Sequence, residues 1–309
     1  MPKPMAGLRS NFYLLLFKVC RVCWFCTVVK YLFWVHRHVT VNEKSYEVLR
    51  WYWEKSHLAS RIYSALNNSG GGGLFLSVVV VGKPGYGKTS YAYYALKTGI
   101  IKMLCGSEGF FNLDQCIKAL EDKYGELCMC RYCTEPDPID REYRWAYYTG
   151  ITDLERFIND AVKLLVEDSV RRKVLFMDDL VTKSVFGMGG KWRRAYMAFR
   201  EIFRVARVGS SVIIMTATSP DLIPDFIKHA SEYIAVWKYG KLFLYGRYIK
   251  YLEPNEDGSY TAKLERVFED RVPIKAPFGL PKWLEEDINE RKKQLIRDAV
   301  RLAKGDSFA

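Results

Sequence analysis

The sequence predicts an α/β fold with three layers, in which helices cover both faces of a mainly parallel central sheet. Three observations predict this fold. Residues 74–81 form a continuous apolar run rich in valine, the pattern of a strand buried on both faces of a parallel sheet. A glycine-rich turn and a helical pattern follow this run directly. Two further apolar runs, at 174–177 and 211–215, end in carboxylates and in threonines respectively.

The glycine-rich turn fits the pattern G-x-x-x-x-G-K-[ST]. Its glycines let the backbone wrap a phosphate chain with N–H groups pointing inward, and the following helix N-terminus adds partial positive charge. Lys88 is expected to reach the terminal phosphates and the Thr89 hydroxyl to coordinate Mg²⁺. A chance turn is the alternative, but the strand–loop–helix context opposes it. The predicted nucleotide-binding residues are Gly82, Lys83, Pro84, Gly85, Tyr86, Gly87, Lys88, Thr89 and Ser90.

The charge of the chain is concentrated in two zones. The 309 residues carry a formal net charge of +12, of which residues 1–38 supply six Lys/Arg and no acid. Residues 171–207 supply ten Lys/Arg against three acids. Two basic zones on a nearly neutral body indicate nucleic acid or an anionic membrane surface as a partner.

Four segments are expected: an apolar basic segment at 1–40, a helix (42–66) and glycine-rich joint at 41–73, the core at 74–240, and antiparallel strands with a final helix at 241–309. Residues 12–35 are long enough to span a bilayer, but Lys18, Arg21 and Lys30 interrupt them. This stretch is a membrane anchor, a helix docked on protein, or extra residues from an upstream start. The sequence leaves the three open.

The eight cysteines do not indicate a secreted disulfide framework, because no cleavable signal pattern is evident. Five of them lie in an acidic insertion near 104–143. Cys128, Cys130 and Cys133, with Cys116 or Cys105 as a fourth ligand, have a spacing compatible with zinc, although it departs from paired C-x-x-C knuckles. Reduced or disulfide-linked cysteines are the alternative, and the one we favour.

An acidic pair ends the run at 174–177. Asp178 is the expected metal-side carboxylate, meeting the Mg²⁺ shell of Thr89, and Asp179 is the candidate for polarising the attacking water. A core strand ending in a solvated acidic turn is the alternative. The strand at 211–218 ends in Thr216 and Thr218, which are candidates for sensing the γ-phosphate.

A glycine-rich loop at 182–190 leads into a predicted helix over 191–208, whose arginines share one face and whose apolar residues share the other. The arginine face is solvated, contacts a DNA backbone, or supplies an arginine finger to a neighbouring subunit. Arg204 and Arg207 suit the finger best, whereas the residues beside the glycine-rich loop, Lys191, Arg193 and Arg194, suit DNA better. Patterns at 241–252 and 260–267 predict antiparallel strands, and 281–304 predicts an amphipathic helix.

These motifs together resemble the P-loop ATPases. The loop GKPGYGKT is similar to the GxPGxGKT form of AAA+ proteins, and VLFMDD resembles a Walker B strand. Phosphate loop, acidic strand tip and polar strand tip occur in the order of the additional-strand (ASCE) division, which implies one extra strand between the first two. The Asp-Asp-Leu run and T-x-T tip look similar to helicase loaders and initiators. The later antiparallel strands look more like RecA-type or HerA/FtsK-type motors, and the mixed character resembles small ATPases of archaeal viruses and plasmids.

The resemblance implies ATP and Mg²⁺ as cofactors and a homo-oligomer as the working form. The sequence therefore predicts a P-loop NTPase that hydrolyses ATP and acts on DNA through 171–207, in replication initiation, helicase loading, translocation or packaging. The alternative is a membrane-associated ATPase for secretion, conjugation or virion assembly. The expected location is the cytoplasm, or the membrane surface if 12–35 is an anchor.

Overall fold

The structure is a computed structural model, and it describes part of the chain. The described residues are 46, 49–67, 75–107, 109, 112–125, 127, 133–142, 146–147, 173–178, 197–201, 203–204, 210–219, 223–231, 233–239, 243–251, 262–263, 268–273 and 280–303. The chain divides into two units, Met1–Lys44 and Ser45–Ala309, and every described residue lies in the second. The apolar stretch at 12–35 and the glycine loop at 182–190 lie outside the described residues.

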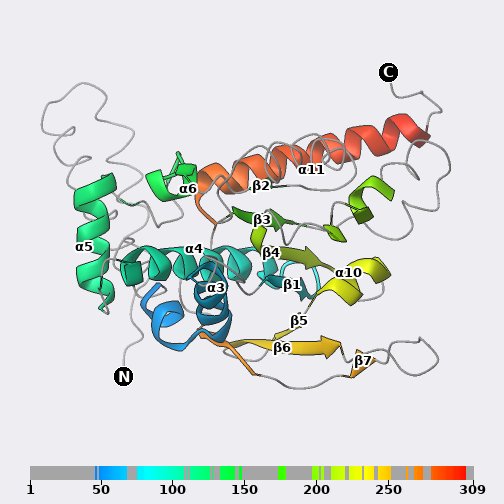
Figure 1. Ribbon diagram of the computed structural model, residues 1–309. Helices are drawn as coiled ribbons and strands as arrows, with labels where there is room; N and C mark the ends of the chain where they lie inside the picture. The colour runs from blue at the N-terminus through cyan, green and yellow to red at the C-terminus, as the bar shows by residue number, and fades with distance from the viewer. Residues whose placement is uncertain are drawn as a thin grey trace, which may run out of the picture. The chain divides into compact units, whose positions relative to one another are not determined.

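An eight-stranded sheet organises this unit (Figure 1). Its main path runs β2-β3-β4-β1-β5-β6-β7, and β8 pairs with β6. Neighbours from β2 to β5 are parallel, whereas β6 pairs antiparallel with β5, β7 and β8. The strands are β1 (Leu76–Val81), β2 (Ala146–Tyr147), β3 (Lys173–Met177), β4 (Ser210–Ala217), β5 (Tyr233–Tyr239), β6 (Phe243–Tyr251), β7 (Ala262–Lys263) and β8 (Arg271–Pro273).

This order confirms the predicted fold class, a three-layer P-loop NTPase fold. β4 lies between β1, which precedes the phosphate loop, and β3, which ends in the carboxylate, so the expected additional strand is present. The antiparallel strands expected at 241–252 and 260–267 correspond to β6 and β7. Strand β8 is not predictable from the sequence, because three residues are too few to show an alternating pattern.

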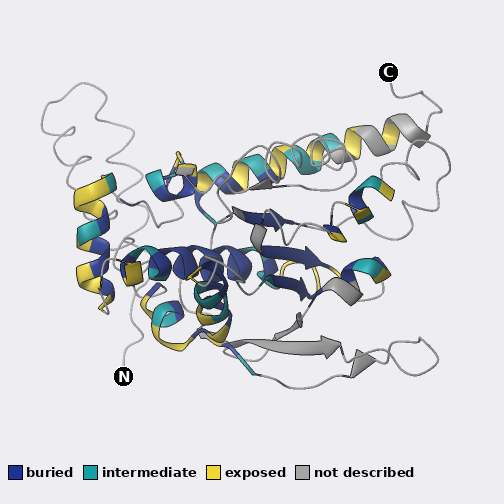
Figure 2. Cartoon of the chain, viewed as in Figure 1, coloured by how far each residue is buried: buried dark blue, intermediate teal, exposed yellow. Residues whose placement is uncertain are grey.

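The central strands are apolar on both sides, as expected for strands that are covered on both faces. All six residues of β1 are buried. On one face Val78, Val80 and Phe176 belong to a core with helices α3 (His57–Asn67) and α4 (Lys88–Ser107). The side chains at the alternate strand positions, such as Val79 and Met215, are also buried, but they do not belong to that core. Figure 2 shows the central strands β1, β3 and β4 in the colour of buried residues.

The phosphate-loop helix α4 (Lys88–Ser107) packs along α3 (His57–Asn67). Their close approach depends on Gly99, where an added Cβ would lie 2.5 Å from Cγ2 of Ile62. The sequence predicted one continuous helix over 42–66, but the structure has a break at Ser56. Ser56 Oγ accepts from Ala59 N at 3.2 Å, so Ser56 acts as the N-cap of α3.

The remaining described helices connect and flank these elements. Helix α5 (Leu113–Tyr124) starts at Asn112, whose side chain accepts from Asp114 N, and ends at Gly125, which has a φ of 89°. The others are α6 (Pro138–Glu142), α10 (Asp225–Ala230) and α11 (Lys282–Ala303). Leu284 and Ile288 of α11 are buried in the α3–α4 core, as the amphipathic pattern predicted.

Candidate functional site

The parallel register brings three chain segments together at the carboxyl ends of β3, β4 and β1. Met177 of β3 pairs with Met215 of β4, so the next residues, Asp178 and Thr216, lie level with one another. Thr216 in turn pairs with Val80 of β1, two residues before the phosphate loop begins. Strand pairing alone therefore places the predicted carboxylate and the predicted sensor threonine beside that loop.

The phosphate loop has the backbone geometry of an anion-binding turn. Gly85 and Gly87 have φ values of 79° and 78°, a region that residues with a Cβ rarely adopt. An added Cβ at Gly85 would meet no atom within 4 Å, so the positive φ, and not crowding, favours glycine there. Gly82 N donates to Ala217 O at 3.0 Å, which fixes the start of the loop against β4. The loop then enters α4 at Lys88.

One carboxylate oxygen collects two hydroxyl donors. Thr89 Oγ1 donates to Asp178 Oδ1 at 2.7 Å, and Thr216 Oγ1 donates to the same oxygen at 2.8 Å. Asp178 and Thr216 are both fully buried. Charge-assisted hydrogen bonds of this kind orient an ionised carboxylate. Asp178 is therefore held with one oxygen against the first turn of α4.

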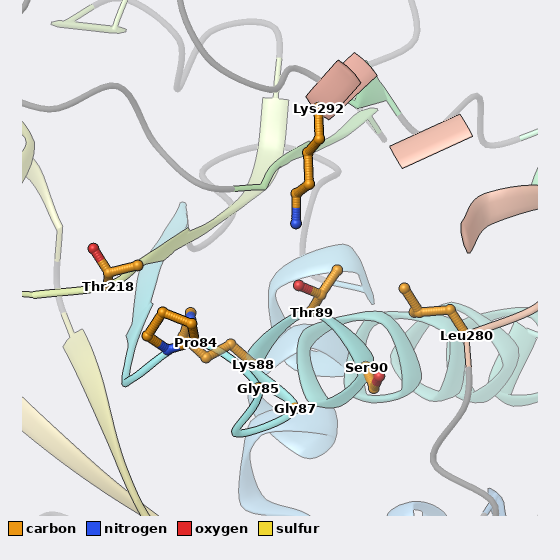
Figure 3. A pocket seen from close by; sticks show the side chains of 9 residues that line it. All are labelled: Pro84, Gly85, Gly87, Lys88, Thr89, Ser90, Thr218, Leu280 and Lys292. Atoms are coloured by element: carbon orange, nitrogen blue, oxygen red, sulfur yellow. The ribbon is translucent and has the colours of Figure 1, made fainter. Parts of the chain in front are cut away.

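A cavity of about 370 Å³ opens over the loop (Figure 3). Lys88 borders it, and Lys88 Nζ donates to Lys83 O at 3.3 Å. Figure 3 shows Lys292 extending from α11 toward the space between Thr89 and Thr218. The lining residues are Pro84, Gly85, Gly87, Lys88, Thr89, Ser90, Thr218, Leu280 and Lys292.

A magnesium nucleoside triphosphate fits the donor set of this cavity. Mg²⁺ prefers oxygen ligands and is held by one or two protein groups together with phosphate oxygens. The adjacent Thr89 hydroxyl and Asp178 carboxylate supply such oxygens. The positive-φ loop and the start of α4 supply N–H groups for phosphates, and Lys88 supplies a cation. The bound metal would supply charge neutralisation at the terminal phosphate.

The structure places the remaining predicted site residues as follows. Thr218 is exposed and lines the cavity, whereas Thr216 is buried behind it. Arg204 lies on the short helical segment that includes residues 197–201, and its side chain is 68% exposed and paired with Glu201 at 3.1 Å. Asp179 and Arg207 lie outside the described residues. The roles of all these residues stay predictions.

Two residues that line the cavity, Leu280 and Lys292, were not predicted from the sequence. Both come from the C-terminal region, which the motifs do not reach. A signal for Lys292 was present, because positions 284, 288 and 292 share one helix face and the first two are buried apolar residues. A lysine that continues a buried apolar face indicates a polar environment beneath it.

A buried charge cluster supports α4 from behind the site. Lys97 Nζ donates to Asp137 Oδ2 at 2.6 Å and to Asp140 Oδ2 at 2.8 Å, and all three side chains are almost fully buried. Burial raises the pKa of Asp140 to about 6 against the lowering effect of Lys97. Burial alone would lower the pKa of Lys97, but the carboxylates of Asp140 and Asp137 outweigh it and raise that pKa.

A second buried carboxylate joins α3 to α4. Asp270 accepts from His57 N at 2.8 Å and from Ser56 Oγ at 2.8 Å, at the start of α3. It also accepts from the hydroxyl of Tyr91 in the first turn of α4 at 2.7 Å. An anionic side chain is favoured at a helix N-terminus, so Asp270 fixes α3 and α4 together.

The cysteines of the insertion form disulfides in the described part of the chain. Cys105, near the end of α4, is joined to Cys116 of α5, and Cys133 is also disulfide-bonded. These bonds remove Cys105, Cys116 and Cys133 as zinc ligands, so the structure does not support the zinc alternative. Cys128 and Cys130 lie outside the described residues. Within the described ranges, no group of three or more Cys, His, Asp or Glu is placed to bind a metal.

Among the described helices, none combines the length and apolar character needed to cross a membrane.

No protein-family model matches the sequence, and no curated protein matches it. The solved structures similar to it include a KaiC-like protein from Pyrococcus horikoshii, with 12% identity, a TM-score of 0.34, and coverage of 69% of this chain and 91% of that chain. An ATPase domain has 11% identity, a TM-score of 0.33, and coverage of 66% and 83%. The N-terminal domain of zonular occludens toxin from Neisseria meningitidis has 10% identity, a TM-score of 0.32, and coverage of 62% and 96%. Values this low carry no function over to this chain.

Proposed function

We propose that this chain is a Mg²⁺-dependent ATPase that works as a homo-oligomer on DNA. The observation that carries the ATPase part is the pair of threonine hydroxyls on Asp178 Oδ1, beside the phosphate loop. This arrangement joins the predicted metal ligand, the predicted metal-side carboxylate and the predicted sensor through two hydrogen bonds. Transition states of phosphoryl transfer are stabilised mainly by such positioned charges and dipoles.

The proposed division of labour uses residues of several elements. Lys88 and Mg²⁺ neutralise charge that develops on the phosphates, with Thr89 and Asp178 on the metal side. Asp179, with Thr216 or Thr218, orients the attacking water. Arg204 or Arg207 of a neighbouring subunit supplies the remaining positive charge.

The DNA part rests on the basic zone at 171–207. Arg200 and Arg204 belong to this zone, and their side chains are 38% and 68% exposed. Both contact Glu201, but surface ion pairs of this kind contribute little and exchange readily for phosphate contacts. Initiation, helicase loading, translocation and packaging all fit this proposal. The antiparallel strands β6 and β7 favour the RecA-type or HerA/FtsK-type comparison over the AAA+ one. We also propose that this chain comes from an archaeal virus or plasmid.

The test is ATP turnover by the full chain, with and without DNA, beside a Lys88→Ala variant. We expect turnover that requires Mg²⁺, rises with DNA and is lost in the variant. Basal turnover that depends on Lys88 but ignores DNA would refute the DNA part. It would favour the alternative, a membrane-associated ATPase whose basic apolar segment at 12–35 is the functional surface. Sedimentation with anionic vesicles checks that alternative directly.

DNA binding has its own test in the salt dependence of affinity. Each phosphate contact contributes roughly 0.9 to the slope of log K against log salt. Arg193→Gln and Arg200→Gln should each reduce the slope by about one. Arg271→Gln is the matched control, because Arg271 is 64% exposed and paired with Glu269 at 3.1 Å, but lies on β8. A slope unchanged in both zone variants would refute this surface as the DNA contact.

A further inference from the structure

Helix α11 carries a cation into the phosphate cavity. Lys292 lines that cavity together with the phosphate loop, although it lies more than 200 residues further along the chain. It continues the helix face of Leu284 and Ile288, which are 0% and 4% exposed in the core. The buried part of α11 therefore fixes the helix, and the next position on that face lies over the loop (Figure 3).

The surroundings of Lys292 are those of a phosphate contact. Its Nζ lies 3.9 Å from Asp178 Oδ2, while the other oxygen of that carboxylate accepts from Thr89 and Thr216. The side chain is 44% exposed, so its ammonium is accessible from the cavity. Lys88 borders the same cavity from the loop, so two ammonium groups from separate elements face it.

We propose that Lys292 binds the terminal phosphate of the nucleotide in the same chain, so that α11 distinguishes a triphosphate from a diphosphate. This inference rests on the proposed nucleotide binding, but not on ATP turnover or DNA. The metal-side carboxylate marks where the metal and the outermost phosphate belong, and Lys292 is the cavity residue that approaches that carboxylate from α11. The backbone of the phosphate loop cradles the α- and β-phosphates, which both nucleotides possess, and Lys88 reaches the β- and γ-phosphates.

The position of α11 is linked to other parts of the unit. Trp283 N, in its first turn, donates to Cys133 O at 3.0 Å. The segment that begins at Cys133 also carries Asp137 and Asp140, which hold Lys97 of α4. A contact between Lys292 and a phosphate would therefore add one more link between α11 and α4, close to the middle of α11. The amide groups of α11 should then exchange more slowly with a triphosphate than with a diphosphate.

The experiment compares nucleotide affinities of the full chain and two variants. Lys292→Met removes the ammonium and keeps the apolar stem. Lys293→Met is the matched control, because Lys293 is the next residue, is 65% exposed and is paired with Glu290 at 3.3 Å on the outer face. The probes are ADP and a slowly hydrolysed ATP analogue, each with Mg²⁺, and the readout is the ratio of their Kd values.

We expect Lys292→Met to weaken binding of the triphosphate about tenfold, the size typical of one lost hydrogen bond to a charged group, and to leave ADP binding within twofold. Lys293→Met should change neither. Lys292→Arg should keep most of the preference for the triphosphate, because it keeps the charge. An equal loss for both nucleotides, or no loss for either, would overturn the proposal.

A second readout separates this inference from the proposed function. Amide exchange of α11 should slow with the triphosphate in the wild type and in Lys293→Met, but not in Lys292→Met. Equal protection in all three proteins would overturn the inference while leaving the ATPase proposal standing. A wild-type protein that binds neither nucleotide would overturn both. A protein that binds with the expected preference but does not turn over ATP would support this inference and refute the ATPase.

Discussion

Replacing Lys97 by methionine tests the physical argument about α4 most directly. Lys97 lies in the middle of the phosphate-loop helix, with its ammonium 2.6 Å from Asp137 and 2.8 Å from Asp140. The side-chain exposures are 1% for the lysine and 0% for both carboxylates. Lys97→Met keeps most of the volume and removes the charge. Two buried carboxylates then face each other without a cation.

The expected cost follows from this burial. Breaking a buried ion pair by removing one partner typically destabilises a protein by about 3–5 kcal/mol, because an uncompensated charge remains. For a domain of this size about 1 kcal/mol corresponds to about 2–4 °C in Tm. We therefore expect Lys97→Met to lower Tm by about 10 °C at pH 8. The equivalent loss at an exposed surface pair would be about 1 kcal/mol or less.

The pH dependence of that cost has a defined sign. In the wild type the pKa of Asp140 is about 6, above its value near 3.9 in an unfolded chain. Between these two values the folded state holds a proton that the unfolded state has released, so stability falls as pH rises. Without Lys97 the pKa of Asp140 rises further, so the pH range over which stability falls extends to higher pH. The loss of stability in Lys97→Met relative to the wild type, called the deficit below, should be smaller at pH 5 and should grow as pH rises through 6 toward 8.

Thermal and guanidinium unfolding at pH 5 and pH 8 measures this deficit. Lys102→Met is the matched control, because Lys102 lies on the same helix with its ammonium 5.3 Å from the ring centroid of Trp53. It should cost about 1 kcal/mol or less at both pH values. A second variant, Lys97→Met with Asp137→Asn and Asp140→Asn, should recover part of the loss and remove its pH dependence. An equal deficit at both pH values, or a Lys97→Met deficit matching that of Lys102→Met, would refute the reasoning.

Three further predictions concern the same helix and its site. Gly99→Ala should destabilise the protein by about 1–3 kcal/mol in guanidinium unfolding, because the new methyl would overlap Ile62; an unchanged midpoint would contradict the close packing. Replacing Cys105 and Cys116 together by serine should lower Tm by the equivalent of about 3 kcal/mol, the usual effect of opening a short disulfide loop. Reductant should then lower the Tm of that variant less than it lowers the wild-type Tm. Thr216→Val removes one hydroxyl donor from the buried carboxylate, so we expect kcat to fall about tenfold or more while nucleotide Kd changes less than threefold; a weakened Kd with an unchanged kcat would assign Thr216 to binding alone.

The sequence predicted the centre of this fold well because its signals are local. A buried valine strand, a glycine-rich turn and a helix follow one another within 30 residues, and each element has its own pattern. The tip of β3 was predicted for the same reason, since an apolar run ending in carboxylates is visible without any partner. Parallel register then placed Asp178 beside Thr216, and no side-chain preference was needed for that step.

Elements that depend on distant partners were harder to predict. Serine is a favoured N-cap residue, so Ser56 is compatible with a helix start. The acceptor that stabilises the start of α3, however, is Asp270, 213 residues beyond His57. The helical pattern on either side is continuous, so hydrophobic periodicity alone predicts one helix. Cysteine spacing likewise left zinc and disulfides open, because the pairing of Cys105 with Cys116 depends on how α5 packs against α4.

Two lysines, Lys97 and Lys292, show that residue type and position on a helix do not by themselves predict what a side chain does. Lys97 lies on the largely buried helix α4 and Lys292 on the amphipathic helix α11, and both occupy a helix face that packs inward. Lys97 is fully buried, because two carboxylates from the insertion reach it. Lys292 stays 44% exposed, because α11 passes over a cavity at that point and the carboxylate it approaches is 3.9 Å away. A lysine enclosed by its counterions contributes to stability, whereas a lysine at the border of a cavity is placed to contact an anionic ligand. We therefore expect Lys97→Met to lower the stability of the protein and to keep its preference for the triphosphate. We expect Lys292→Met to lose that preference and to keep the stability.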